Sequence, residues 1–218
     1  MKAHHEHEFE AALGLPEDLP RNEYIVWQGR PDWRQLAIEA FHVRKLAIYF
    51  AIMVCLQGVH LLDGDATGIV MLKQLGTSIG LATLALGLLT WSAYWSAQAT
   101  MYTLTNKRII MRIGIVLSLT FNLPLKKITS CDLQLAKKQT GNIALGIASE
   151  SPIGWLNLWP HVRPWRVSSP QPTLRCVPHA ADLAQRIWQT WRQVNPTEQL
   201  LSAQTEATHG NSQAWGQA

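Results

Sequence analysis

The sequence has 218 residues, and 47% of them are apolar, enough for one or two domains with a sizeable core, so wholesale disorder is excluded. Its net charge of +4 averages over segments that differ sharply. Residues 46–106 carry only two acidic and one basic side chain, whereas residues 107–192 carry twelve Lys or Arg against three Asp or Glu. A long stretch almost without charge beside a basic segment is not typical of a uniformly soluble protein and indicates membrane insertion.

The N-terminal 23 residues are polar and acidic and are interrupted by Pro16 and Pro20, which is the reverse of a cleaved signal peptide. We interpret them as a flexible terminus. The histidines of the HHEHE segment could hold a divalent metal loosely, but nothing orients them, and a solvated terminus is the favoured interpretation. We therefore predict no metal site. The odd cysteine count argues against a disulfide framework, so we expect three reduced and mostly buried thiols: Cys55, Cys131 and Cys176.

Two apolar segments, residues 43–62 and residues 75–95, are predicted to be membrane-spanning helices. Twenty residues at about 1.5 Å each span roughly 30 Å, the thickness of one hydrocarbon layer. Trp91, Tyr94 and Trp95 lie at the far end of the second segment, where aromatic rings favour the headgroup region. Two buried helices of a soluble all-α domain are the competing interpretation, but a chain this short has no other helices to cover them.

Basic side chains flank the outer ends of this predicted hairpin, whereas the connection between its helices holds a single lysine, Lys73. Positive residues stay on the cytoplasmic side of a membrane, so we expect a multi-pass protein with both termini on the cytoplasmic side. Seven side chains make up the flanking basic set: Arg30, Arg34, Arg44, Lys45, Lys107, Arg108 and Arg112.

Small residues recur along the second helix at spacings of four and three and form one stripe, in which Gly76, Gly80 and Gly87 alternate with Thr83 and Thr90. Glycines at this spacing let another helix approach closely. The stripe is therefore predicted to be a helix-packing surface. Its partner is left open between the chain's own first helix and another protein, with homodimerisation as a further option.

After Thr100 the hydrophobic pattern changes from helical to alternating, which indicates strands. Asn106 and Lys107 suit the tight turn of a hairpin. Closely spaced short strands suggest a sandwich or small barrel, and the amphipathic helix expected over residues 180–194 would cap it through Leu183, Ile187, Trp191 and Val194. The predicted strands cover residues 100–105, 108–115, 116–124, 128–135, 142–148 and 153–158, with a turn at Gly141-Asn142.

The segment YTLTNKRIIMRIGI, directly after a two-helix membrane hairpin, resembles the bacterial pleckstrin-homology-like (PH-like) family. Five further segments narrow the resemblance to the PuhB family of photosynthetic complex assembly proteins of purple bacteria, and the last two are the specific ones. These segments are WQGRPDW at 27–33, FHVRK at 41–45, NLP at 122–124, LWPHVRPWR at 158–166 and PQPTLRCVP at 170–178.

The resemblance implies an α+β membrane protein in which a two-helix transmembrane hairpin carries a PH-like β-barrel or sandwich capped by a C-terminal helix. The expected organisation is a flexible N-terminus (1–23), a juxtamembrane segment (24–42), the transmembrane hairpin (43–98), a cytoplasmic PH-like domain (99–194) and a disordered tail (195–218).

No nucleophile, acid–base or metal-ligand arrangement is recognisable in the sequence, so we expect neither an enzyme nor a cofactor. His42 and His60 could ligate bacteriochlorophyll magnesium in a protein that serves pigment complexes, but ordinary interfacial hydrogen bonds are the favoured interpretation. Nucleic-acid binding is not expected, because no basic motif interleaved with aromatics is present.

Two binding roles remain open. The resemblance implies an assembly factor that contacts reaction-centre or core-antenna subunits in the photosynthetic membrane, through a surface of Trp159, His161, Arg163, Trp165 and Arg166. The alternative is a PH-like module that binds anionic lipid headgroups and serves envelope maintenance. Its candidate headgroup contacts are Lys107, Arg108, Arg112, Lys126 and Lys127.

Overall fold

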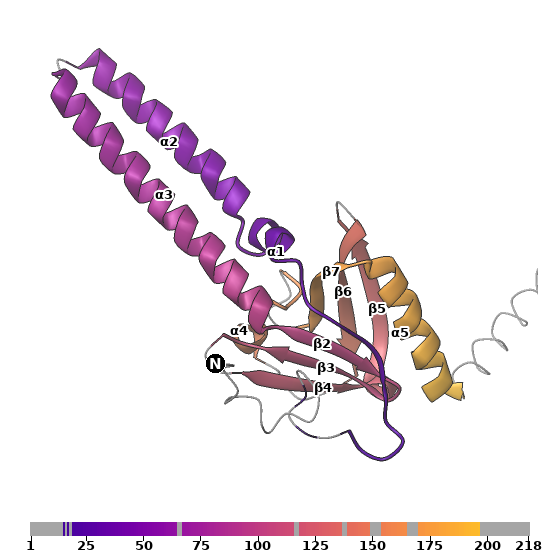
Figure 1. Ribbon diagram of the computed structural model, residues 1–218. Coiled ribbons are helices and arrows are strands. Elements are labelled where there is room, and N and C mark those ends of the chain that lie inside the picture. Colours follow the sequence, from indigo (N-terminus) through magenta and orange to yellow (C-terminus); the bar gives the residue numbers. More distant parts are fainter. Residues whose placement is uncertain are drawn as a thin grey trace, which may run out of the picture.

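The structure, a computed structural model, describes residues 15, 17, 19–64, 67–115, 118–136, 139–148, 154–164 and 170–196. Figure 1 shows a long helical hairpin that projects from a domain of two antiparallel sheets and a C-terminal helix. The α+β class with a helical hairpin is therefore confirmed.

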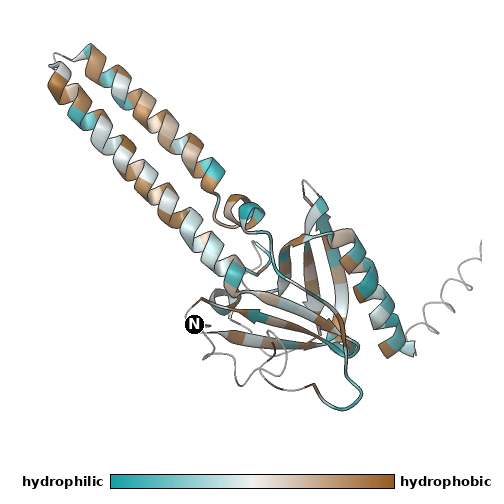
Figure 2. Ribbon diagram, in the orientation of Figure 1, coloured by the Kyte–Doolittle hydropathy of each residue, from teal (hydrophilic) through white to brown (hydrophobic). Residues whose placement is uncertain are grey.

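The hairpin consists of α2 (Val43–Asp63) and α3 (Gly68–Ala99), and both helices are long and apolar enough to cross a membrane. Figure 2 shows apolar residues distributed around both of them. Along α3, half-buried residues recur at spacings of four and three and form the face that packs against α2. This face contains Met71, Leu75, Ser78, Ala82 and Ala85, whereas Leu89 packs against the small core that α3 forms with α1.

The first sheet, sheet A, has the strand order β1-β2-β3-β4, and every neighbouring pair is antiparallel. β1 (Ile25–Gly29) precedes the hairpin, whereas β2 (Met101–Thr105) follows it directly. β3 (Arg108–Ile113) and β4 (Leu119–Pro124) complete the sheet. The predicted boundary at residue 99 therefore divides one sheet, because β1 belongs to the same domain as β2.

A 3-10 turn, η1 (Leu125–Lys127), leads from sheet A into the second sheet, sheet B, whose strand order is β5-β6-β7. β5 (Ile128–Leu135) has the predicted bounds. β6 (Thr140–Ile147) contains Gly141 and Asn142, so the turn predicted there is wrong. α4 (Trp155–Leu158) is a helix where a strand was expected, and β7 (Thr173–Pro178) was not predicted.

The main core lies between the two sheets and α5 (Ala180–Val194). Leu183 and Ile187 of α5 are buried, and Trp191 and Val194 pack against the same core, which confirms the predicted helix face. Hydrophobic burial of this face is what holds α5 on the sheets. The expectation of mostly buried thiols is wrong for Cys55 and Cys131, which are exposed; Cys176 is buried.

α1 (Trp33–Glu39) fills the corner between α3 and β7 and forms a second small core there. Its N-cap is Asp32, whose carboxylate accepts a hydrogen bond from the backbone N–H of Arg34. Leu36 and Ala37 pack against Ala93 and Ala97 of α3. The hairpin is therefore held to the domain at two places, through α1 and through the direct continuation of α3 into β2.

Candidate functional site

The loop of residues 159–164, between α4 and β7, holds all three described residues of the predicted contact surface, Trp159, His161 and Arg163. It pairs with the chain that enters β7: the Arg163 N–H donates to the Gln171 carbonyl, and the Thr173 N–H donates to the His161 carbonyl, both at 3.0 Å. These backbone bonds hold the loop in one conformation against sheet B.

His161 anchors the loop from inside the domain, where its side chain has 0% exposure. The Thr100 hydroxyl donates to the Ser96 carbonyl (2.7 Å), so it accepts at 3.0 Å from the Nε2–H of His161. The Tyr102 hydroxyl accepts from the Arg175 N–H (3.2 Å) and donates at 2.6 Å to Nδ1 of His161. The chain of bonds assigns a neutral imidazole whose two nitrogens are both satisfied.

Burial controls the protonation of this cluster. It lowers the pKa of His161 to about 3, and the positive charge of Arg175 acts in the same direction. Burial also raises the pKa of the Tyr102 phenol. Both side chains are therefore neutral at physiological pH. The prediction that His161 forms part of an exposed contact surface is wrong, because the imidazole is buried and fully hydrogen-bonded.

Trp159, by contrast, is 46% exposed. Its ring meets the ring of Phe41 edge-on, with 5.1 Å between the ring centroids. Phe41 lies between α1 and the first turn of α2, so Trp159 sits where the hairpin joins the domain. One side of the indole is fixed by this contact, and the other side is open to a partner.

Arg163 forms a surface ion pair, because its Nη1 donates to Asp132 Oδ2 at 2.6 Å and to Gln171 Oε1 at 3.1 Å. Both charged side chains are more than a third exposed. Surface pairs of this kind contribute about 0–1 kcal/mol. A carboxylate of a partner could therefore replace Asp132 at little cost.

The pair borders a polar pocket of about 320 Å³ on the face of sheet B that is turned away from α5. We call it the sheet B pocket. Arg175 contributes a second guanidinium, whose Nη1 donates to the Pro160 carbonyl at 3.2 Å. Sequence patterns did not reveal the pocket, because its residues come from four separate segments. Its lining consists of Asp132, Leu133, Gln134, Asn142, Ala144, Arg163, Pro164, Thr173 and Arg175.

Hydrogen bonds also couple the edge of this pocket to α1. Asn142 donates from Nδ2 to Glu39 Oε2 at 2.8 Å, and its Oδ1 accepts from the backbone N–H of Cys176 at 2.9 Å. The Cys176 carbonyl accepts from the Asp32 N–H at 2.8 Å. Burial, with the nearby carboxylate of Glu39, raises the pKa of the Cys176 thiol to about 12, so this thiol stays protonated.

Comparison with known proteins places the chain in a family. The family model described as "Bacterial PH domain" matches residues 56–190, which is more than half of the chain. The chain belongs to the bacterial PH domain family. It is 34% identical over 181 residues to a protein of Rhodobacter capsulatus, and the match covers 83% of this chain and 85% of the relative. The description of that relative reads "uncharacterized 23.7 kDa protein in puhA 5′ region". No solved structure matches the chain.

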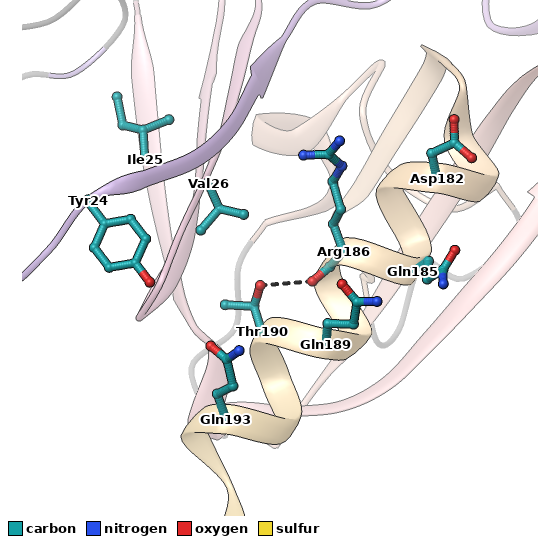
Figure 3. Close-up of a pocket in the computed structure, with 9 residues that line it drawn as sticks. All are labelled: Tyr24, Ile25, Val26, Asp182, Gln185, Arg186, Gln189, Thr190 and Gln193. Carbon is teal, nitrogen blue, oxygen red and sulfur yellow. Dashed lines mark hydrogen bonds between the residues drawn. The ribbon is translucent and has the colours of Figure 1, made fainter.

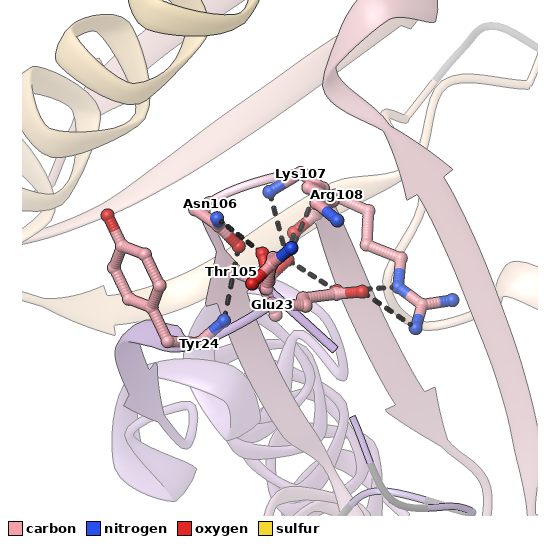
Figure 4. A network of polar contacts seen from close by, with 7 residues as sticks. Glu23, Tyr24, Thr105, Asn106, Lys107 and Arg108 are labelled. Atoms are coloured by element: carbon pink, nitrogen blue, oxygen red, sulfur yellow. Dashed lines mark hydrogen bonds and ion pairs between the residues drawn. The ribbon is translucent and has the colours of Figure 1, made fainter. Parts of the chain in front are cut away.

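The predicted headgroup contacts of this bacterial PH domain fall into two groups, two arginines on β3 and three exposed lysines. Arg108 donates from Nε and Nη2 to both oxygens of Glu23, at 2.8 and 3.2 Å, and Glu23 also accepts from the Thr105 hydroxyl (Figure 4). Arg108 is therefore paired with a carboxylate and is not available for a lipid phosphate. Arg112, on β3, is half-buried.

The three lysines of that set, Lys107, Lys126 and Lys127, are exposed. They lie together, because the Leu125 N–H of η1 donates to the Lys107 carbonyl at 3.0 Å. Figure 1 shows this β2–β3 turn at the end of the domain opposite to the hairpin. The placement does not fit the prediction that the cluster contacts the membrane in which the hairpin would lie.

The glycine stripe of α3 does not face α2. A Cβ built at Gly76, Gly80 or Gly87 meets no atom within 4 Å. The stripe is offset by one residue, about 100° around the helix, from the face that packs against α2. The interpretation that it packs against the chain's own first helix is therefore wrong, and contact with another molecule remains a prediction. Trp165 and Arg166 lie outside the described residues.

Proposed function

We propose that this protein is a membrane-anchored assembly factor of the PuhB type, which contacts subunits of the bacterial photosynthetic reaction centre or core light-harvesting complex while that complex forms. The observation that carries the proposal is the Rhodobacter capsulatus relative, whose description refers to the puhA 5′ region. The segments LWPHVRPWR and PQPTLRCVP of the present sequence support it. The factor acts by protein contact and without catalysis.

In this proposal α2 and α3 anchor the protein in the inner, intracytoplasmic photosynthetic membrane, with both termini on the cytoplasmic side. Their length and apolar composition support the anchor. The distribution of flanking basic residues supports the orientation. The domain is then held directly beneath the bilayer, where membrane-embedded subunits emerge.

Trp159 and Arg163 make the proposed contact. Both lie on a loop already fixed by hydrogen bonds, so little conformational entropy is lost when a partner binds. Trp and Arg are also the side chains that most often dominate binding energies at interfaces. The ring contact between Trp159 and Phe41 supports this proposal, because a partner bound at Trp159 would lie beside the base of the hairpin, in the same membrane.

The test measures assembled reaction-centre and core-antenna complex per cell, by absorbance of the complex, in strains that carry variants of this protein. Trp159→Ala should lower the amount of complex several-fold while the level of the variant in the membrane stays normal. Trp188→Ala is the matched control, because Trp188 is 52% exposed and belongs to α5, which Figure 1 shows on the side of the domain away from the hairpin. It should leave the complex unchanged.

Two results would contradict the proposal at different levels. If the two tryptophan variants lower the amount of complex equally, the assignment of Trp159 to the contact surface is wrong. Normal complex levels in a strain that lacks the whole protein would remove the assembly role itself.

A further inference from the structure

A groove on the side of the domain remote from the hairpin is not used by the proposed function. It runs between β1 and α5 and encloses about 660 Å³, within the range of ligand sites. We call it the β1–α5 groove, and Figure 3 shows the residues that face each other across it. They are Tyr24, Ile25 and Val26 from the strand side, and Asp182, Gln185, Arg186, Gln189, Thr190 and Gln193 from the helix.

One wall of the groove is the free edge of a sheet. β1 is the terminal strand in the order β1-β2-β3-β4, so only one of its sides pairs with a strand of sheet A. Tyr24 exchanges two bonds of 3.2 Å with Asn106: its N–H donates to Asn106 Oδ1, and its carbonyl accepts from the Asn106 N–H. Backbone groups alternate in direction along an antiparallel strand, so the N–H and carbonyl of Ile25, the residue after Tyr24, point away from β2 and toward the groove. The register of β1 against β2 shifts between Ile25 and Trp27, so this alternation does not continue regularly beyond Ile25.

The opposite wall is a row of amide side chains. Gln185, Gln189 and Gln193 recur every fourth residue and therefore lie on one face of α5. All three are exposed, and none makes a hydrogen bond to a residue in the described part of the chain. Each offers two N–H donors and one carbonyl acceptor.

The strand wall is shorter than the helix wall. Its three lining residues, Tyr24, Ile25 and Val26, extend about 10 Å, whereas the helix rises about 16.5 Å from Asp182 to Gln193. A segment in extended conformation would therefore pair with β1 over about three residues and continue along α5.

Charge restricts the class of ligand. Within residues 107–192 basic residues outnumber acidic ones by twelve to three, yet the groove is lined by one acidic and one basic side chain, Asp182 and Arg186. The neutral walls present peptide and amide groups instead. Such groups recognise the backbone of another polypeptide and give little attraction to lipid phosphates or nucleic acid.

We propose that the β1–α5 groove binds an extended peptide segment of a partner protein, which adds as a strand to the free edge of β1 while the glutamines of α5 hydrogen-bond its outer side. The backbone of Ile25 supplies the central pair of hydrogen bonds. This proposal is independent of the photosynthetic role, because it rests on the groove alone.

The probe is a library of random peptides of about 12 residues displayed on phage and selected on the full-length protein in lipid nanodiscs. Selected peptides are synthesised, and their dissociation constants are measured by fluorescence anisotropy. Ile25→Pro should weaken binding about tenfold, because it removes the N–H that faces the groove and leaves the side paired with β2 intact. Ile25→Thr keeps that N–H and is the matched control, with affinity near that of the wild type.

Two further comparisons separate strand addition from other modes. Replacing Gln185 and Gln189 together by alanine should weaken binding, whereas Gln134→Ala, in the sheet B pocket, should not. Methylation of alternate backbone nitrogens of the peptide should abolish binding for one set of positions and not for the other. Peptides that bind wild type and Ile25→Pro equally would overturn the proposal.

Other occupants give different results. If the protein self-associates and Ile25→Pro abolishes this self-association, the groove is occupied by a second copy of the chain. That result would overturn the assignment to a partner protein. If removal of residues 197–218 by itself raises the peptide affinity about tenfold, the groove is occupied by the chain's own tail. That result would also overturn the assignment to a partner protein.

Discussion

The Tyr102 hydroxyl lies 2.6 Å from Nδ1 of His161, although the two residues are 59 positions apart in the sequence. This bond joins β2, the strand that continues directly from the hairpin, to the loop that carries Trp159 and Arg163. The first residue after α3, Thr100, holds the other nitrogen of the same imidazole. The candidate contact loop is therefore tied to the base of the hairpin through one buried, neutral histidine.

Acidification should destabilise the domain through this histidine. Its pKa is about 6.5 in the unfolded chain and about 3 in the folded one, so the unfolded state binds more protons between these values. Above pH 6.5 the titration of His161 does not reduce the free energy of unfolding. As the pH drops from 6.5 toward 3, this free energy falls by up to about 1.4 kcal/mol per pH unit.

His161→Gln tests this pH dependence, because an amide can still donate to Thr100 and accept from Tyr102 but does not titrate in this range. Between pH 7.5 and pH 5 the wild type should lose about 2 kcal/mol more stability than the variant, measured by denaturant unfolding of the full chain. The exposed His179 provides the control: His179→Asn should keep the wild-type pH dependence. Parallel pH profiles for wild type and His161→Gln would contradict the prediction.

Glu23 should be a stability determinant although it precedes the first strand. Its side chain is 3% exposed and accepts from Thr105 and from two nitrogens of Arg108. Glu23→Gln removes the charge and one acceptor, at a cost of about 1–3 kcal/mol. Glu17, which is exposed, supplies the matched substitution Glu17→Gln. Thermal unfolding of both variants tests the prediction: Glu23→Gln should have the lower midpoint temperature. Equal midpoints would mean that the buried carboxylate contributes nothing to the stability of the domain.

The glycine stripe of α3 predicts an intermolecular helix contact. Gly80→Leu should leave folding and insertion unchanged, because a Cβ there meets open space, but should reduce cross-linking between molecules several-fold. Gly58→Leu on α2 also enters open space and should not affect cross-linking. If both variants cross-link like the wild type, the stripe faces lipid.

The orientation of the hairpin is testable with reporter fusions. A fusion at Gly68, at the start of α3, should report a periplasmic position, and one after Arg192 a cytoplasmic position, because the basic residues flank the outer ends of the helices. The reverse pattern would overturn the topology, together with the side of the membrane assigned to the domain.

Strong local patterns were read correctly from the sequence. The two apolar helices, the β2–β3 hairpin, β5 and the buried face of α5 each carry a period that few alternatives share. β1 and β7 are not predictable from a hydrophobic period: IVWQG is a five-residue edge strand with no clear alternation, and TLRCVP belongs to a segment that contributes only to the family resemblance. The four residues Trp155–Leu158 are too short for either period to decide between helix and strand.

The candidate site was only partly predictable. Aromatic and basic composition drew attention to residues 158–166, where Trp159 is exposed and Arg163 is partly exposed, and their role in a contact stays a prediction. Burial of His161 depends on Thr100 and Tyr102, which are about 60 residues away, so no local pattern could indicate it. The buried ion pair of Glu23 could not be predicted either, because its partner Arg108 follows the hairpin and is 85 residues away in the sequence.

The position of β1 ahead of the hairpin and β2 behind it has a consequence for biogenesis. As the chain is synthesised, β1 emerges first but has no strand to pair with until both long helices have been made and Met101–Thr105 follows. For a hairpin that enters a bilayer, the first sheet then closes only in molecules whose two ends have returned to the same side. Correct insertion thus becomes a precondition for folding, and a chain with one helix left outside the membrane would expose an incomplete sheet to proteolysis.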